Sequence, residues 1–125
     1  MDTNIKLVLR KPPSINHIYA YTSRGGYAHS YITSEGRTWF EEGIYKAKVQ
    51  SSGVRFAKTK LKLEIHLFTS REIQDIDNIN KPLLDLLQKS EIIDNDKYIY
   101  ELHSYKEICT KESERVELIL SPILS

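Results

Sequence analysis

The chain has 125 residues, 40% of them apolar, and a formal net charge of +1. This length and composition fit a single domain, residues 1–125, with one modest core. No apolar run approaches the ~20 residues that a membrane span needs, and the N-terminus lacks the apolar segment of a signal peptide. We therefore expect a cytoplasmic protein with no membrane partner. The one cysteine, Cys109, excludes an internal disulfide.

Charge is divided unevenly along the chain. Residues 1–62 contain 11 Lys/Arg against 4 Asp/Glu, whereas residues 63–125 contain 7 against 13. A basic half beside an acidic half suits an enzyme that holds cations with carboxylates and binds a polyanion with lysine and arginine. Mixed-charge domains also show such a division by chance, so it is only supporting evidence.

The first third of the chain predicts a strand followed by a long connection. Ile5 to Leu9 alternate as a strand does, and Pro12 and Pro13 end it because proline has no amide proton for the sheet. Residues 14–32 contain four tyrosines and show no clean period, which indicates a loop or short ribbon with its tip at Gly25-Gly26. Tyrosines beside basic residues suit nucleic-acid contact, although each tyrosine could equally pack onto the core.

The remaining pattern predicts two helices and three strands. The first helix is capped by Thr33 or Ser34 and runs to about Gln50, and the second covers about Asn80 to Lys89. Leucine and isoleucine at every second position make residues 61–68 the clearest strand. Two more strands follow, with residues 109–114 read as the hairpin loop between them, and their expected ranges are 98–107 and 115–120. This order predicts an α+β fold with a single mixed sheet and two main helices packed on it.

The segment "DIDNINKPLLDLL", Asp75 to Leu87, contains the candidate catalytic residues. Pro82 is tolerated only in the first turn of a helix, so the helix should begin near residues 79–81 and both aspartates should precede it. In an extended segment Asp75 and Asp77 would share one face, where their carboxylates repel each other unless a cation lies between them. Mg²⁺ typically takes one or two carboxylates and completes its shell with water and substrate phosphate. The segment therefore suggests a metal site.

Other readings of these residues stay open at this point. An aspartate before a helix is commonly a cap, and in most loops the motif Asp-x-Asp alone does not indicate a metal site. The acidic residues Asp94 and Asp96 follow the helix, whose ten residues rise about 15 Å, so they approach Asp75 only if the chain doubles back. Lys81, just inside the helix, could bind the scissile phosphate or stabilise charge in the transition state.

The segment from Asp75 to Ile99, "DIDNINKPLLDLLQKSEIIDNDKYI", resembles the signature of the RusA family of Holliday junction resolvases, which is widespread in phages and prophages. That signature is Asp-x-Asp-Asn-x-x-Lys at a helix start, then Leu and a further Asp, then an acidic pair before the next strand. "KPPSIN" resembles the family's Pro-Pro-Ser-x-Asn turn, and "TSEGRTWFEE" resembles its next helix start. The matching acidic-segment positions are Asp75, Asp77, Asn78, Lys81, Asp85 and Asp96.

The resemblance implies a homodimeric, Mg²⁺-dependent crossover junction endodeoxyribonuclease. Such an enzyme binds branched DNA, a four-way junction, and nicks it symmetrically in recombination and repair, in a bacterial cytoplasm or near the nucleoid. Mn²⁺ should substitute for Mg²⁺, and no small-molecule cofactor is expected. The implied metal ligands are Asp75, Asp77 and Asp96, with Lys81 as the catalytic lysine and Asn78 and Asp85 in support.

Two details of the implied site remain open. The family usually has two adjacent aspartates where this chain has Asp94-Asn95-Asp96, so Asp94 is the fallback third ligand. The resemblance also does not say whether Lys81 acts within its own subunit. The DNA-facing surface is expected in the basic first half, where the residues that we assign to it are Arg10, Lys11, Asn16, Arg24 and Arg37.

Three rival functions remain. The first is a nuclease of the same fold that cuts flaps or forks, which a panel of branched substrates would separate from a resolvase. The second is a catalytically inactive module that binds DNA junctions, which would not cut in Mg²⁺ or Mn²⁺. The third is a small phage interaction protein whose acidic residues are solvated surface.

Overall fold

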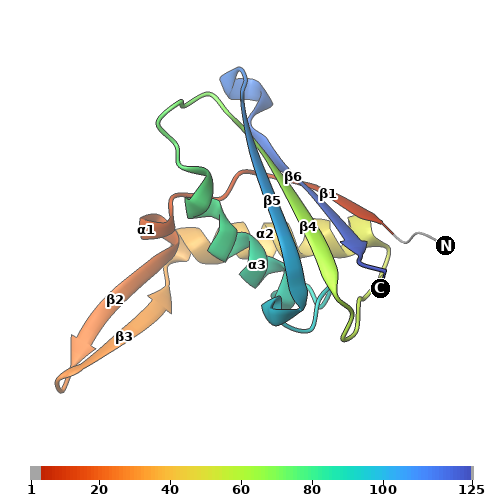
Figure 1. Ribbon diagram of the computed structural model, residues 1–125. Coiled ribbons are helices and arrows are strands. Elements are labelled where there is room, and N and C mark those ends of the chain that lie inside the picture. The colour runs from red at the N-terminus through yellow and green to blue at the C-terminus, as the bar shows by residue number, and fades with distance from the viewer. Residues whose placement is uncertain (1–3, 125) are drawn as a thin grey trace.

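The computed structural model describes residues 4–124, apart from the side chains of Arg24 and Tyr27. Four strands form a mixed sheet in the order β1-β6-β4-β5, and two form a separate ribbon, β2-β3 (Figure 1). In chain order the strands and α-helices are β1 (Ile5–Leu9), α1 (Ile15–Ile18), β2 (Tyr19–Arg24), β3 (Tyr27–Ile32), α2 (Ser34–Ser51), β4 (Leu61–Thr69), α3 (Asn80–Lys89), β5 (Ile99–Ile108) and β6 (Arg115–Pro122). Short 3₁₀ turns are η1 (Ile76–Ile79), η2 (Asp96–Tyr98) and η3 (Lys111–Ser113).

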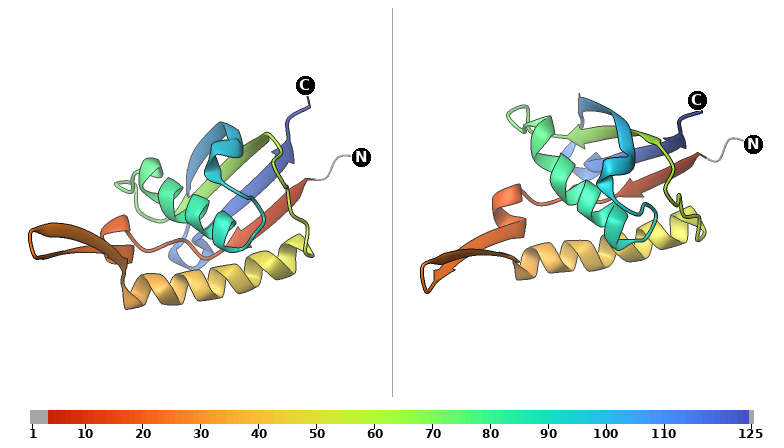
Figure 2. Two further views of the ribbon diagram at one scale, coloured as in Figure 1. Left: turned by 90° about the horizontal axis from the view of Figure 1, so that it is seen from below. Right: turned by 60° about the horizontal axis from the view of Figure 1, so that its bottom comes forward.

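The core lies between one face of the sheet and the helices α2 and α3, which both pack on that face (Figure 2). Alternate residues of β1, β4 and β6 are buried, because successive side chains of a strand point to opposite faces. In β4 the buried set begins with Leu61 and continues at every second residue to Thr69. The predicted α+β fold with a mixed sheet and two packed helices is confirmed.

Helix α2 begins where the sequence predicts. The hydroxyl oxygen of Thr33 accepts a hydrogen bond from the amide of Gly36 at 3.0 Å, which satisfies one of the free donors of the first turn. Trp39, Phe40 and Ala47 are buried along the face that meets the sheet. The indole of Trp39 donates to the carbonyl of Arg10 at 3.0 Å and so fixes the chain where it leaves β1. In residues 4–124 no helix is long and apolar enough to cross a membrane.

Residues 14–32 form a short helix and a ribbon, the second of the two alternatives that the sequence allowed. The strands β2 and β3 pair from Tyr19↔Ile32 to Arg24↔Tyr27 and extend away from the sheet and helices (Figure 1). Gly25 and Gly26 make the turn with φ of 59° and 84°, a region that glycine adopts without strain. Tyr21 and Tyr31 are exposed on this ribbon.

The predicted hairpin between the last two strands is wrong. β5 pairs only with β4, in parallel, whereas β6 lies between β1 and β4 and is antiparallel to both. Residues 109–114 therefore pass across the end of β4, and the amide of Cys109 donates to the carbonyl of Thr69 at 2.9 Å. The strand β6, whose alternate residues are buried, lies in the interior of the sheet. The exposed residues of β5 suit an edge.

Candidate functional site

Asp75 and Asp77 lie between the end of β4 and the start of α3. Helix α3 starts at Asn80, so Pro82 falls in its first turn as predicted. Asp75 has an extended backbone with ψ of 134°, but Asp77 belongs to the 3₁₀ turn η1, so the expectation that both lie in one extended segment is wrong. The turn forms because the amide of Asn80 bonds to the carbonyl of Asp77, which joins η1 to the helix.

Both carboxylates are accessible to solvent, and that of Asp75 lies beside a cavity. Asp75 and Asp77 are exposed, and within residues 4–124 neither side chain has a hydrogen bond or an ion pair with a described side chain. Asp75 lines a cavity of about 320 Å³ together with Ser14, Arg71 and Asn78. Uncommitted carboxylate oxygens of this kind are the donors that a hard divalent cation prefers, so the residues fit a magnesium ion.

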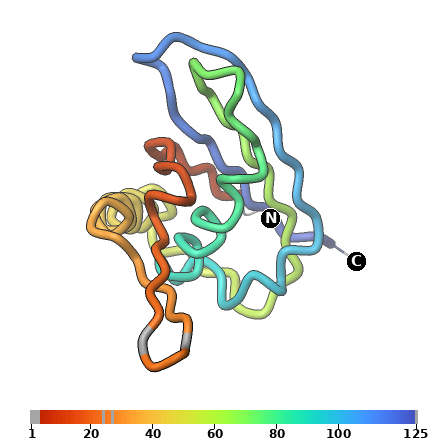
Figure 3. The backbone as a smooth tube through the Cα atoms, turned by 90° about the vertical axis from the view of Figure 1, so that its left-hand side faces the viewer, coloured from red at the N-terminus to blue at the C-terminus, as the bar shows by residue number. Residues whose placement is uncertain are grey.

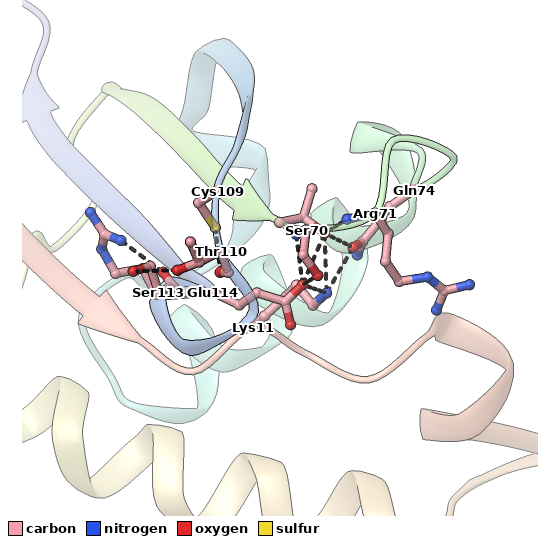
Figure 4. Close-up of polar contacts among 10 residues, drawn as sticks. Lys11, Ser70, Arg71, Gln74, Cys109, Thr110, Ser113 and Glu114 are labelled. Carbon is pink, nitrogen blue, oxygen red and sulfur yellow. Dashed lines mark hydrogen bonds and ion pairs between the residues drawn. The ribbon is translucent and has the colours of Figure 1, made fainter.

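Glu114 holds the loop that leads from β4 to Asp75 (Figure 4). Its Oε2 accepts from the amide and the hydroxyl of Ser70, at 2.8 and 2.7 Å, and from Nζ of Lys11 at 3.2 Å. These hydrogen bonds, first those from Ser70 and then that from Lys11, lower the pKa of Glu114 to about 2. The start of the loop is therefore tied to the N-terminal end of β6.

Gln74, the residue before Asp75, is held from two sides. Its Oε1 accepts from Nζ of Lys11 at 3.0 Å and from the hydroxyl of Thr69 at 2.9 Å. Nζ of Lys106, on β5, donates to the carbonyl of Gln74 at 3.1 Å and to that of Glu72 at 2.8 Å. The position of Asp75 is thus set by contacts from β4, β5 and the segment that follows β1.

Lys11 therefore has a different position from the one expected. Its side chain is only 17% exposed and its ammonium points to Thr69, Gln74 and Glu114 (Figure 4), so the geometry favours support of the loop over contact with DNA. No local pattern predicts this network, because its members are separated by up to 103 positions.

Lys81 lies against the base of the ribbon. Its Nζ is 4.3 Å from the centre of the Tyr19 ring, within the range of a cation–π contact. The Tyr19 hydroxyl donates to Oδ2 of Asp85. Burial, followed by the hydrogen bond to the Asp85 carboxylate, raises the pKa of Tyr19 above its usual value. Asp85 thus orients the ring on which Lys81 rests, and Tyr19 is a residue that sequence reasoning did not select.

Asp96 lies far from the other two aspartates. It begins η2, directly before β5, whereas Asp75 follows the opposite end of β4, and the two strands run in parallel. Helix α3, with a rise of about 15 Å, separates η1 from this end of the fold (Figure 1). Among the described residues no three His, Cys, Asp or Glu side chains are close enough to share a metal ion. The structure does not bring Asp96 to Asp75 and Asp77 within one chain.

The fallback ligand Asp94 is already engaged. Its Oδ1 accepts from Nε and Nη2 of Arg55, at 3.0 and 2.6 Å, and its Oδ2 accepts from the amide of Lys58 at 3.0 Å. The hydrogen bond from Arg55 is the main cause that lowers the pKa of the Asp94 carboxyl. Asp96 is exposed and has no such partner among the described side chains, so the geometry favours Asp96 as the free carboxylate of the pair.

The other residues expected at a DNA surface are spread over the N-terminal half. Arg10 is exposed and pairs with Glu42 at 3.1 Å. Asn16 and Arg37 are exposed on α1 and α2. The side chain of Arg24, at the ribbon tip, lies outside the described atoms. Arg71, which the sequence reading did not select, is exposed at the cavity beside Asp75.

Comparisons with known proteins agree on one family. The family described as Endodeoxyribonuclease RusA matches residues 11–120. The crossover junction endodeoxyribonuclease RusA of Aquifex aeolicus (strain VF5) is 32% identical over 88 residues, which cover 70% of this chain and 68% of that protein. The matched range includes the Asp75–Lys81 segment, Glu114 and the whole ribbon.

Proposed function

We propose a function from one premise: the chain belongs to the RusA family of crossover junction endodeoxyribonucleases. It is a nuclease that resolves Holliday junctions, and in our proposal it does so as a Mg²⁺-dependent homodimer that places paired, symmetric nicks in recombination and repair. The observation that carries the proposal is the pair of uncommitted carboxylates, Asp75 and Asp77, on a loop fixed by Glu114 and two lysines.

The chain's own residues would have three roles: binding the metal ion, positioning the loop and stabilising charge in the transition state. Asp75 and Asp77 would hold the metal ion, which when bound supplies a Lewis acid and a water that is more acidic than bulk water. The loop contacts of Gln74 keep Asp75 in place, so little reorganisation is needed when substrate arrives. Lys81, on the first turn of α3, would place its ammonium against the scissile phosphate and stabilise the charge that develops there.

Asp96 would complete the site from the partner subunit. Its distance from Asp75 in one chain, and the lack of a three-carboxylate cluster among the described residues, support a site shared between two copies. A two-fold dimer then has two such sites, which suits a four-way junction with near two-fold symmetry. In this arrangement the partner's Asp96 contributes the third carboxylate, while Asp94 stays paired with Arg55.

The test is a cleavage panel with the full chain. A four-way junction, a flap, a fork and a linear duplex of matched sequence are incubated with Mg²⁺, with Mn²⁺ and with EDTA. We expect paired nicks at symmetric positions of the junction in either metal, and none in EDTA. Asp75→Asn should bind the junction but not cut it. If flaps or forks are cut in preference to the four-way junction, the protein is a nuclease for those substrates and not a resolvase. If the protein binds the junction but does not cut it in either metal, it is a catalytically inactive junction-binding module.

A further inference from the structure

We propose that Tyr19 is a positioning residue for Lys81. Its hydroxyl occupies the Asp85 carboxylate and its ring holds the Lys81 ammonium, so that Lys81 stays available to the scissile phosphate. The inference deepens the proposed function, because it rests on the role assigned there to Lys81. Tyr19 acts only through Lys81 and touches neither metal nor DNA.

Lys81 has a carboxylate within easy reach on its own helix, yet it does not pair with it. Asp85 follows Lys81 by four residues on α3, and helical residues at this spacing are neighbours on one face. None of the ion pairs among residues 4–124 joins the two side chains. The same spacing on α2 does give an ion pair, in which Nζ of Lys46 lies 2.9 Å from Oε1 of Glu42. A further contact therefore keeps the Lys81 ammonium away from Asp85.

Tyr19 makes that contact with both groups. Its hydroxyl donates to Oδ2 of Asp85, and its ring centre lies 4.3 Å from Nζ of Lys81. Figure 3, a view from the side of the ribbon, shows the base of β2 beside α3. An ammonium is attracted to the face of an aromatic ring, which holds it without a formal negative charge. One side chain thus engages the carboxylate that would otherwise attract Lys81, and also supports the ammonium.

Backbone contacts and burial hold the Tyr19 ring in this place. Its amide donates to the carbonyl of Ile15, and Tyr19 pairs with Ile32 at the base of the ribbon. Only 9% of Tyr19 is exposed. Burial, followed by the hydrogen bond to Asp85, raises the pKa of Tyr19, so its hydroxyl stays protonated at neutral pH. It therefore remains a hydrogen-bond donor to Asp85.

Tyr19→Phe tests the hydroxyl alone, because phenylalanine keeps the ring. The half-buried Asp85 carboxylate would lose its donor and should draw Lys81 away from the phosphate. We expect the single-turnover rate of junction cleavage at saturating DNA to fall about tenfold, while junction affinity in Ca²⁺ changes less than about twofold. Adding Asp85→Asn should restore most of the rate, because a neutral amide attracts an ammonium far less than a carboxylate does.

Two further variants separate positioning of Lys81 from a general structural effect. Tyr45→Phe is the matched control, since it removes the hydroxyl of an exposed tyrosine on α2, and it should cut at the wild-type rate. Lys81→Met with Tyr19→Phe should cut as slowly as Lys81→Met alone, because Tyr19 acts through Lys81. A further tenfold loss in that double variant, or no rescue by Asp85→Asn, would overturn the proposal.

Lys89 is the rival cation for the Asp85 carboxylate. It follows Asp85 by four residues on α3, and its Nζ lies over the Phe40 ring, 5.3 Å from the centre. If Lys89 took the carboxylate in Tyr19→Phe, Lys81 would stay free and the cleavage rate would equal that of wild type. That result would overturn the proposal.

NMR of the chain with ¹³C-methylated lysines gives a measurement that needs no cleavage. Methyl groups over an aromatic ring are shifted upfield by the ring current, and the Lys81 signal is identified by its loss in Lys81→Met. We expect this signal upfield in wild type, closer to those of exposed lysines in Tyr19→Phe, and upfield again when Asp85→Asn is added. A Lys81 signal that does not move in Tyr19→Phe would overturn the proposal.

The two measurements distinguish failure of the positioning role from failure of the proposed function. If wild type cuts no junction but the Lys81 signal responds as expected, the proposed function fails and the control of Lys81 by Tyr19 stands. If wild type cuts junctions and Tyr19→Phe cuts them equally well, the positioning role fails and the nuclease activity stands.

Discussion

The ammonium of Lys11 touches side-chain oxygens of Thr69, Gln74 and Glu114, which gives a sharp prediction at the scale of one residue. Lys11→Met should reduce junction cleavage at saturating DNA by about tenfold to a hundredfold, since a small displacement of catalytic groups is costly. It should also raise the Mg²⁺ concentration needed for half-maximal rate, while junction affinity in Ca²⁺ changes less than about twofold.

The matched control for this variant is Lys111→Met, which removes an exposed lysine from η3. It should change neither the rate nor the Mg²⁺ requirement. If the Lys11→Met protein cleaves normally at saturating DNA but binds the junction weakly, Lys11 contacts DNA, as the sequence pattern predicts.

Glu114 makes the stability of the fold depend on pH in acid. Its pKa is about 2 in the folded chain, below its ordinary value of 4.5, so its carboxylate stabilises the fold above pH 4.5 and that contribution is lost as the pH falls toward 2. Urea unfolding midpoints measured from pH 7 to pH 3 should fall more steeply for wild type than for Glu114→Gln. Equal slopes for the two proteins would mean that the hydrogen bonds from Ser70 and Lys11 do not persist in solution.

Lys81 is the side chain to which we assign stabilisation of transition-state charge. Lys81→Met should lower the rate of cleavage about a hundredfold in single-turnover conditions, the usual loss when one such donor is removed. Lys89→Met is the control, because Lys89 is on the same helix but its ammonium lies over Phe40, 5.3 Å from the ring centre. An equal loss in both variants would indicate general weakening of DNA binding.

At the scale of elements, only the base of the ribbon β2-β3 contributes to the core, through Tyr19 and Ile32, and its outer part extends away from it. Tyr21 and Tyr31 are exposed on it, and Tyr19 anchors its base to α3. Deleting residues 24–27 should leave the thermal midpoint within a few degrees of wild type, but weaken junction binding at moderate salt about tenfold by removing stacking and charge. Unchanged affinity would exclude the ribbon tip from the DNA surface.

Local patterns predicted the elements well, because each depends on a short stretch of chain. Strand β4 follows from leucine and isoleucine at every second residue, and Pro82 fixed the start of α3 to within one residue. The order of the strands could not be predicted in this way. The crossing of residues 109–114 over β4 depends on which strands pair with one another, and that is a property of the assembled sheet.

The site was predictable to the same extent. The candidates Asp75, Asp77 and Lys81 lie in one segment of seven residues, so the sequence could group them. The residues that hold this segment in place could not be predicted from the sequence. They come from four distant parts of the chain: Lys11, Tyr19, Lys106 and Glu114. The separation of Asp96 from Asp75 follows from the parallel pairing of β4 and β5, which no local pattern specifies.

For the molecule as a whole, we propose that each active site joins Asp75 and Asp77 of one subunit with Asp96 of the partner subunit. Asp75→Asn and Asp96→Asn should each be inactive alone. In a mixed dimer of the two variants, one site would lack both carboxylates and the other would be intact.

The measurement is cleavage of a four-way junction by the two variants, first separately and then after they are unfolded together and refolded. An equal mixture should recover cutting, with single nicks in place of paired ones, at about a quarter of the wild-type number of sites, because half of the dimers are mixed and each has one intact site. A mixture that forms mixed dimers and binds the junction but remains as inactive as either variant alone would contradict the shared active site.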